Sequence, residues 1–291
     1  MGKPVDIDKT RILLMHCVYG LTHPHSSRAF WQGALRPDSP YHGKLWQDQI
    51  ATSFSSHNIL LTAALNSAEE GQPFTHIGIM HNDVVPENGW VDILMEEMDR
   101  TECDLISVVT PIKDLEGKSS TAIDSHDDPF LVHRRLMMNE IFRLPETFDN
   151  VDCGYPDRNL LINTSCFIMR FTEPWATATN EDGSLKLNIT SEDKIRRRED
   201  GKWMAYHSPS DWHLSRTVIQ LGGKVMATRK VKIKHIGDLP YTNEQPWGIY
   251  DTDKALEHVH KNQWIGSRDT VLPTENGSTV TISMTEQDEA A

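Results

Sequence analysis

The chain has few cysteines, no long apolar run and no glycine-rich phosphate loop. Its four cysteines are scattered and form no CxxC pair, which excludes a zinc ribbon and a thioredoxin-type site. No apolar run comes near the about 20 residues that cross a bilayer. The polar N-terminus lacks the apolar core of a signal peptide, and neither GxGxxG nor a P-loop occurs. We therefore expect a cytoplasmic protein with no membrane span.

The composition is that of a folded acidic protein. Of the 291 residues, 38% are hydrophobic and eight are tryptophan, which is enough apolar material for a core and excludes wholesale disorder. The chain has 29 Lys and Arg against 42 Asp and Glu, so its formal net charge is −13. This balance argues against a protein held to nucleic acid mainly by neutralising phosphates.

The N-terminal half alternates between strand and helix patterns. Short apolar runs predict strands at 11–19, 77–80 and 104–110. Helical spacing of apolar residues predicts a helix over 56–70, ended by Gly71, and another from Asn88 or Gly89 to Glu97. This alternation indicates an α/β fold with a mostly parallel central sheet.

The rest of the chain is harder to assign. The charged, turn-rich segment 113–158 is interpreted as a variable surface insertion, and 159–170 returns to strand character. The polar stretch 179–201 contains a charge run that we interpret as a solvated loop or helix face, with a phosphate-binding patch as the alternative. A helix is predicted over 210–221, and edge strands over 224–235.

Two polar segments follow strands of the predicted sheet. Val18-Tyr19-Gly20 ends the first strand, and His81-Asn82-Asp83 ends the second. Because ligands of parallel α/β sheets bind beyond the carboxyl ends of the strands, both segments are expected on one ligand-binding rim.

Five separated segments, taken in order, resemble a known family. They are an opening strand ending at Val18-Tyr19-Gly20, the helix start Ser56-His57-Asn58, the strand and turn His76 to Pro86, the strand Asn163 to Arg170, and Ser210-Asp211 with its helix, Gly222-Gly223 and His235. Together they resemble the nucleotide-sugar glycosyltransferases of the A fold. The resemblance implies a single Rossmann-like domain over residues 1–237, followed by a C-terminal extension and tail over 238–291.

The resemblance also implies roles for residues. Asp83 and His235 would bind a divalent metal, Mn²⁺ or Mg²⁺, which neutralises the departing diphosphate. The nucleotide-sugar donor would be contacted by Val18, Tyr19, Asn58, His81 and Asn82. Asp211, at a helix start that favours its ionised form, would be the catalytic residue and take the proton from an acceptor hydroxyl.

Two positions depart from the family pattern. His81 replaces the first acidic residue of the DxD triplet, and Ser210 replaces a Glu. An alternative function is therefore a degenerate, non-catalytic module that binds nucleotide or glycan. A metal hydrolase is a third possibility, although no HExxH occurs.

Each site residue also has a structural interpretation. Asp83 would be part of a turn, Asp211 would cap a helix, His235 would be an ordinary core or surface histidine, and Asn58 would satisfy backbone near the helix start. The sequence leaves these interpretations open beside the functional ones.

The partners follow only in outline. The donor would be a UDP- or GDP-sugar, and the acceptor hydroxyl would belong to a protein, a glycan, a lipid-linked sugar or a modified nucleobase. Nucleic acid is the least favoured because of the acidic net charge, although Arg196-Arg197-Arg198 forms a local basic strip. A small transferase without an anchor resembles phage and bacterial enzymes, so the compartment would be the host cytoplasm if a phage encodes it.

Overall fold

The computed structural model describes residues 10–18, 22–34, 42–48, 53–128, 131–197, 199–237, 240–247, 270–273 and 279–282. The chain divides into two compact units, Met1–Gly248 and Ile249–Ala291. The described part of the second unit is an antiparallel pair, β16 (Thr270–Pro273) and β17 (Thr279–Ile282). None of the described helices is long and apolar enough to cross a membrane.

A seven-stranded mixed sheet forms the centre of the first unit. In spatial order its strands are β2 (His42–Asp48), β1 (Arg11–Cys17), β3 (His76–His81), β10 (Cys166–Arg170), β5 (Leu105–Val108), β13 (Val225–Thr228) and β8 (Thr147–Phe148). β10 and β8 run antiparallel to their neighbours, and the other five strands share one direction. The α/β class and the parallel strands expected from the sequence are thus confirmed.

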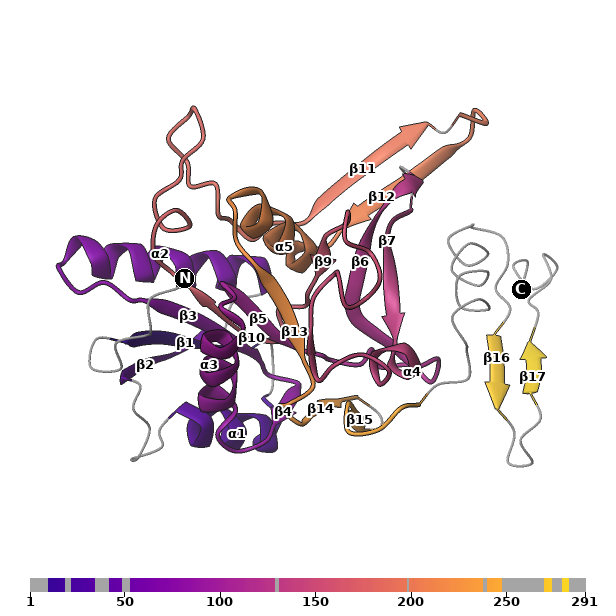
Figure 1. Cartoon of the computed structure of the whole chain (residues 1–291), viewed down its shortest axis with the longest axis horizontal. Coiled ribbons are helices and arrows are strands. Elements are labelled where there is room, and N and C mark those ends of the chain that lie inside the picture. The colour runs from indigo at the N-terminus through magenta and orange to yellow at the C-terminus, as the bar shows by residue number, and fades with distance from the viewer. Residues whose placement is uncertain are drawn as a thin grey trace, which may run out of the picture. The chain divides into compact units, whose positions relative to one another are not determined.

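Helices cover both faces of this sheet (Figure 1). They are α1 (Pro24–Ala34), α2 (Ser53–Glu69), α3 (Trp90–Thr101) and α5 (Ser210–Gln220). Along β1, Leu13 and Met15 pack in the hydrophobic cluster that includes α2 and α5. Ile12 and Leu14 point the other way, into the cluster that includes α1 and α3. A strand buried on both faces is continuously apolar, which is why β1 was recognisable in the sequence.

The segment 113–158 is not a surface insertion, and that interpretation is wrong. It contains β6 (Lys118–Asp128), β7 (Leu131–Met137) and the short helix α4 (Met138–Ile141). With β9 (Leu160–Leu161), β6 and β7 form a second, antiparallel sheet. Ile123 and Leu136 are buried in the same cluster as β1 and α2. The many charges of this segment concealed its apolar positions.

Three further expectations need correction. β13 lies between β5 and β8 inside the central sheet and is no edge strand. The predicted strand 159–170 is divided into β9 and β10 by the buried turn around Asn163. The polar stretch 179–201 is not all loop, because β11 (Glu192–Arg197) pairs with β12 (Trp203–Ser208) as an antiparallel hairpin.

A third sheet joins the turn after β3 to the end of the first unit. β4 (Val84–Pro86) pairs with β14 (Ile233–Ile236), which pairs in turn with β15 (Pro240–Thr242). Asn243 is fully buried, and its side chain accepts a bond from the Ile233 amide and donates to the Val109 and Val231 carbonyls. These contacts attach β15 and Asn243 to the first unit, which ends at Gly248.

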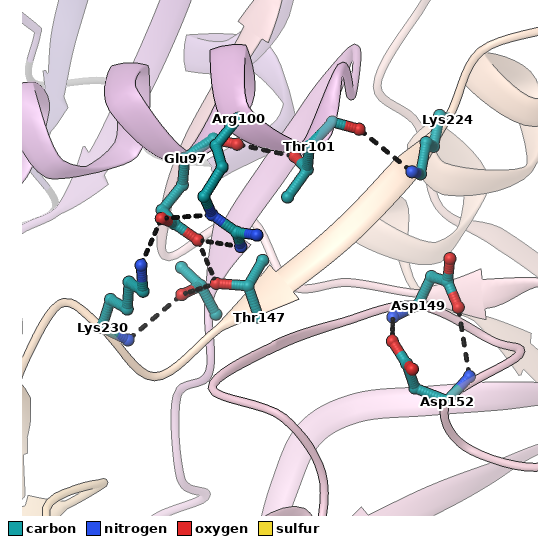
Figure 2. A network of polar contacts seen from close by, with 9 residues as sticks. Glu97, Arg100, Thr101, Thr147, Asp149, Asp152, Lys224 and Lys230 are labelled. Carbon is teal, nitrogen blue, oxygen red and sulfur yellow. Dashed lines mark hydrogen bonds and ion pairs between the residues drawn. The ribbon is translucent and has the colours of Figure 1, made fainter.

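Glu97 links α3 to the strands beside it through a network of polar contacts (Figure 2). Its carboxylate accepts hydrogen bonds from Arg100, from the Lys230 ammonium at 2.5 Å and from the Thr147 hydroxyl at 2.5 Å. Thr147 also bonds Thr228 of β13. Burial alone would raise the pKa of Glu97, but these donors lower it to about 2. The carboxylate is therefore ionised throughout the physiological range.

Replacing Glu97 by Gln should lower the free energy of unfolding by about 1–3 kcal/mol at pH 7, because the buried carboxylate that accepts from Thr147, Arg100 and Lys230 loses its charge. The carboxyl pKa lies below its unfolded value, so this contribution is complete above about 4.5 and is lost as pH falls toward 2. Urea unfolding at pH 7 and pH 3 measures both effects. Glu96→Gln, at the exposed neighbouring position, is the control and should change stability by about 0.5 kcal/mol or less. Equal effects of the two substitutions would contradict the network's role.

Candidate functional site

Strand pairing brings Asp83 and His235 together across 152 positions of sequence. Asp83 lies in the turn between β3 and β4, and His235 lies on β14. His235 pairs with Val84, and the Ile236 amide donates to the Asp83 carbonyl at 2.7 Å. As a result the His235 Nε2 atom lies 3.3 Å from Asp83 Oδ2. The two residues expected to hold a metal are therefore adjacent.

The second nitrogen of His235 fixes the tautomer. Nδ1 lies 2.7 Å from the Pro111 carbonyl oxygen, which only accepts, so Nδ1 carries the proton. In neutral His235 the Nε2 lone pair then faces the Asp83 carboxylate. Two acceptors face to face need a proton or a cation between them. An imidazole held through its far nitrogen by a backbone carbonyl is also the usual arrangement of a histidine metal ligand.

Lys113 is the third member of this group. Its ammonium donates to Asp83 Oδ2 at 2.6 Å. Burial would raise the pKa of Asp83, but the hydrogen bonds from His235 and Lys113 and the nearby positive charges hold it well below its usual range. The second carboxylate oxygen, Oδ1, is enclosed and has no hydrogen-bond partner among the residues described. The site thus presents an ionised carboxylate with one unused oxygen.

His81 and His57 lie next to this group. Their rings stack with centroids 5.6 Å apart, joining the end of β3 to α2. Burial, with a smaller contribution from His81, lowers the pKa of His57 to about 3, and burial also lowers the pKa of His81. Both imidazoles are therefore neutral. In the described part of the chain, His81 Nε2 and both ring nitrogens of His57 are buried without a hydrogen-bond partner. Buried polar atoms are usually hydrogen-bonded, so three unpartnered nitrogens at one place are unusual.

Asp211 occupies the second position of α5. It does not cap the helix, since the N-cap is Pro209 and has no side-chain bond. Its Oδ1 accepts a hydrogen bond from the backbone amide of the adjacent Trp212 at 2.9 Å. The sequence predicted that the helix start would favour the ionised form, but burial is the larger effect and raises the pKa of Asp211 to about 6, against the opposing charge of Arg135. A carboxyl that titrates near neutrality suits general acid–base catalysis.

One short stretch of backbone connects Asp211 to the Asp83 group. Trp212 Nε1 donates to the Ser120 carbonyl at 3.5 Å, and Arg135 donates to the Ser119 carbonyl at 3.4 Å while its guanidinium covers the Trp212 ring. Ser119 forms a β-bridge with Pro111, whose carbonyl holds His235. The Asp83 group and the start of α5 with Asp211 therefore both border the start of β6 and the 111–119 loop.

The remaining predicted donor-binding residues are more dispersed. Val18 is 1% exposed and is a core residue directly after β1. Tyr19 lies outside the described residues. Asn82 is partly exposed in the same turn as Asp83. Both ends of the Asn58 carboxamide bond the backbone of Ile189, each at 2.9 Å, so in this structure Asn58 fastens α2 to a segment 131 positions away.

Sequence reasoning missed Lys113 and Arg135, because both lie in the segment interpreted as an insertion. One signal was present. Pro111-Ile112-Lys113 follows the third predicted strand, so the rim rule applied to the first two strands would have placed Lys113 on the same edge. Arg135 carried no such signal, since β7 reaches the site only through its pairing with β6.

The donors at the Asp83 group fit a divalent cation in part. Asp83 supplies an unused carboxylate oxygen and His235 an available nitrogen, and manganese accepts both. Among the described residues no group of three or more His, Cys, Asp or Glu side chains is arranged to hold a metal ion. Any metal here would complete its coordination with water or with a substrate phosphate, as Mg²⁺ commonly does.

Comparison with known proteins gives little guidance. No known protein family matches the chain, and no curated protein matches it. A solved structure described as "Crystal Structure of A197 from STIV" is similar at a TM-score of 0.45 and 11% sequence identity, covering 83% of this chain and 95% of that one. A similarity this low does not establish a shared fold or function.

Removing the Asn58 side chain tests whether it is structural. Asn58→Ala should lower the free energy of unfolding by about 1–3 kcal/mol, because the buried Ile189 amide and carbonyl lose their partners. Asn66→Ala, at an exposed position of the same helix, is the control and should be neutral or slightly stabilising. Thermal or urea unfolding measures both. If Asn58→Ala unfolds like the parent, the bonds to Ile189 contribute nothing to stability, and the structural role of Asn58 is contradicted.

Proposed function

We propose that the protein is a glycosyltransferase that moves a sugar from a UDP- or GDP-sugar to an acceptor hydroxyl. The observation that carries this proposal is the group of Asp83, His235 and Lys113 at the carboxyl end of β3. Contacts through the 111–120 segment link this group to the helix start that carries the near-neutral carboxyl of Asp211. Loss of a nucleoside diphosphate needs positive charge beside the departing phosphates. Activation of a hydroxyl needs a base. The site holds candidates for both.

Lys113 is the resident cation of the site. Its ammonium already lies beside the Asp83 carboxylate, so a small displacement of its flexible stem would bring it to a phosphate oxygen. A divalent metal, when bound by Asp83 and His235, would supply further charge for the leaving group. His235 is held ready by its bond to Pro111. The resemblance of the sequence to A-fold glycosyltransferases supports the same assignment of Asp83 and His235.

Asp211 would accept the proton of the acceptor hydroxyl. With a pKa of about 6, the Asp211 carboxyl is mostly ionised at pH 7, and it is a stronger base than an ordinary aspartate. Arg135 opposes the effect of burial and so keeps the carboxyl from titrating at a still higher pH. Asp211 is thus favoured as the base over the other carboxylate of the site, since Asp83 is a much weaker base.

The alternative is a nucleotide- or glycan-binding module without turnover. Two observations favour it: a neutral histidine replaces the first carboxylate of the triplet, and Lys113 already neutralises the remaining one. Both functions require nucleotide binding at the same place. They differ in whether bound donor is consumed.

Donor turnover separates the two functions. Incubating the parent with a panel of UDP- and GDP-sugars and manganese should release free nucleotide from at least one donor. Asp211→Asn should reduce transfer or hydrolysis by about 100-fold while nucleotide affinity persists. Asp157→Asn, an exposed control, should behave like the parent. Nucleotide binding without release from any donor would establish the binding module instead.

The titration of Asp211 predicts a pH profile. Because the base must be ionised, kcat should fall by about tenfold per pH unit below pH 6 and level off above pH 7. Initial rates at saturating donor between pH 4.5 and 8 measure this. A kcat that stays constant down to pH 5 would exclude Asp211 as the base.

Two substitutions distinguish the contribution of a metal ion to nucleotide binding from that of Lys113. Asp83→Asn should abolish any manganese dependence of nucleotide binding, because it removes a charged ligand. Lys113→Met should weaken metal-free nucleotide binding by about tenfold and leave the manganese response in place. Calorimetric titration of UDP and GDP, with manganese and with EDTA, gives all four affinities. Full manganese dependence in Asp83→Asn would show that the metal is held elsewhere.

A further inference from the structure

Tyr241 places an aromatic ring beside the group of Asp83, His235 and Lys113. In the register of β14 and β15, Tyr241 pairs with His235, and cross-strand partners project from the same face of a sheet. Gly237 brings Tyr241 close to Lys113 as well. A methyl group on Gly237 would lie 3.1 Å from Lys113 Cδ and 3.4 Å from Tyr241 Cε2. The tyrosine ring and the lysine stem therefore flank one exposed stretch of backbone next to His235.

Neighbouring residues hold the Tyr241 ring without burying it in the core. The ring of Trp247 packs against it with centroids 5.7 Å apart, and the Trp247 indole donates to the Thr242 carbonyl at 2.8 Å. Among the described residues, Tyr241 belongs to none of the hydrophobic clusters, and it is only half-buried. Aromatic side chains with a fixed position and an accessible surface are common in ligand sites.

The small sheet places Tyr241 on the side of the Asp83 group that leads to Asp211. Backbone carbonyls of the segment 109–111 accept hydrogen bonds from Asn243 and His235, so β14 and β15 are fastened to the residues that follow β5. That segment continues into β6, whose start contacts the helix start that carries Asp211. In the central sheet β3 and β10 separate β5 from β1, and Figure 1 shows β15 away from β1 and β2.

The chemistry of sugar transfer would place the donor sugar on this same side. The sugar carbon that is attacked must lie between the departing phosphate and the acceptor hydroxyl. In the proposed site Lys113 faces the phosphate and Asp211 takes the proton of the hydroxyl, so the sugar would lie next to Lys113 on the side of Asp211. The nucleobase would be at the other end of the diphosphate. Because Tyr241 and Lys113 flank the same glycine, the sugar is the part of the donor that Tyr241 would meet.

We propose that Tyr241 binds the sugar of the nucleotide-sugar donor by stacking its ring on the C–H face of the sugar ring. This inference rests on the proposed function, because it assigns one part of the same donor. Tyrosine suits such a ligand, since its ring is an apolar surface for the sugar C–H groups and its hydroxyl can bond a sugar hydroxyl. Tyr241 would thus contribute to the choice of donor sugar, while Lys113 holds the phosphate.

Calorimetric titration of nucleotides with and without a sugar tests the proposal. The five ligands are UDP, UDP-glucose, UDP-N-acetylglucosamine, GDP and GDP-mannose, each with manganese. Tyr241→Ala should raise the Kd of the tightest nucleotide sugar by about tenfold, whereas the Kd of the corresponding free nucleotide should change by less than about twofold. Tyr241→Phe, which retains the ring, should bind the nucleotide sugar within about threefold of the parent.

Two further variants control for packing. Tyr241→Leu keeps an apolar contact with Trp247 but has no aromatic face, so it should repeat the selective loss even if the alanine variant is unstable. Tyr155→Ala removes an equally half-buried tyrosine, whose ring contacts the guanidinium groups of Arg134 and Arg158 instead, and should leave all affinities unchanged. Circular dichroism identifies the variants that are folded.

Three outcomes would overturn the proposal. If Tyr241→Leu binds the nucleotide sugar like the parent, the ring does not contact the donor. If the substitution weakens free nucleotide and nucleotide sugar equally, the ring acts on the nucleotide part and not on the sugar. Both results leave the proposed sugar transfer intact, since the parent still binds the donor. A parent that binds none of the five ligands, or only UDP or GDP, would instead contradict the proposed function and this inference together.

Discussion

The pairing of β4 with β14 is the constraint on which the candidate site depends. It places His235 beside the turn after β3 and so brings an imidazole nitrogen to a carboxylate that is distant in sequence. The neighbouring Pro111 carbonyl then fixes the tautomer of His235. Without this small sheet, Asp83 would be an ordinary turn residue and His235 an ordinary strand residue, which is the structural interpretation that the sequence left open.

Charge balance within the site explains its remaining features. A partly buried carboxylate at Asp83 is tolerated because Lys113 and His235 both face it. Burial raises the pKa of Asp211, and the charge of Arg135 opposes that effect only in part. In the proposed reaction the two carboxyls would therefore take different roles, since the Asp83 carboxylate is a weak base suited to cations and Asp211 can exchange a proton near neutral pH. A pair of acids with separated pKa values is a common basis for dividing catalytic roles.

The sequence predicted those parts of the molecule that are locally encoded. β1, β3 and β5 are apolar runs, α2 and α5 have helical spacing of apolar residues, and all five are present at the expected places. The segment around β6 and β7 was misjudged because its few apolar residues, such as Ile123 and Leu136, become a core only through pairing with distant strands.

The site follows the same rule. Asp83 was predicted from its position at the end of a strand, and His235 and Asp211 from the resemblance to A-fold glycosyltransferases. The predicted direction of the Asp211 pKa shift was wrong, since burial by tertiary contacts outweighs the helix start. Lys113 needed the three-dimensional arrangement of a loop. The contact between His235 Nε2 and the Asp83 carboxylate likewise arises only from the pairing of β4 with β14, which no local sequence pattern predicts.

A crystal structure of the protein soaked with UDP or GDP and manganese is the most direct measurement. The account predicts nucleotide at the carboxyl end of β3, with its diphosphate within hydrogen-bond reach of Lys113 and the metal bound by Asp83 and His235. A nucleotide found elsewhere on the chain, with the Lys113–Asp83 pair undisturbed, would contradict the central claim that this rim is the donor site.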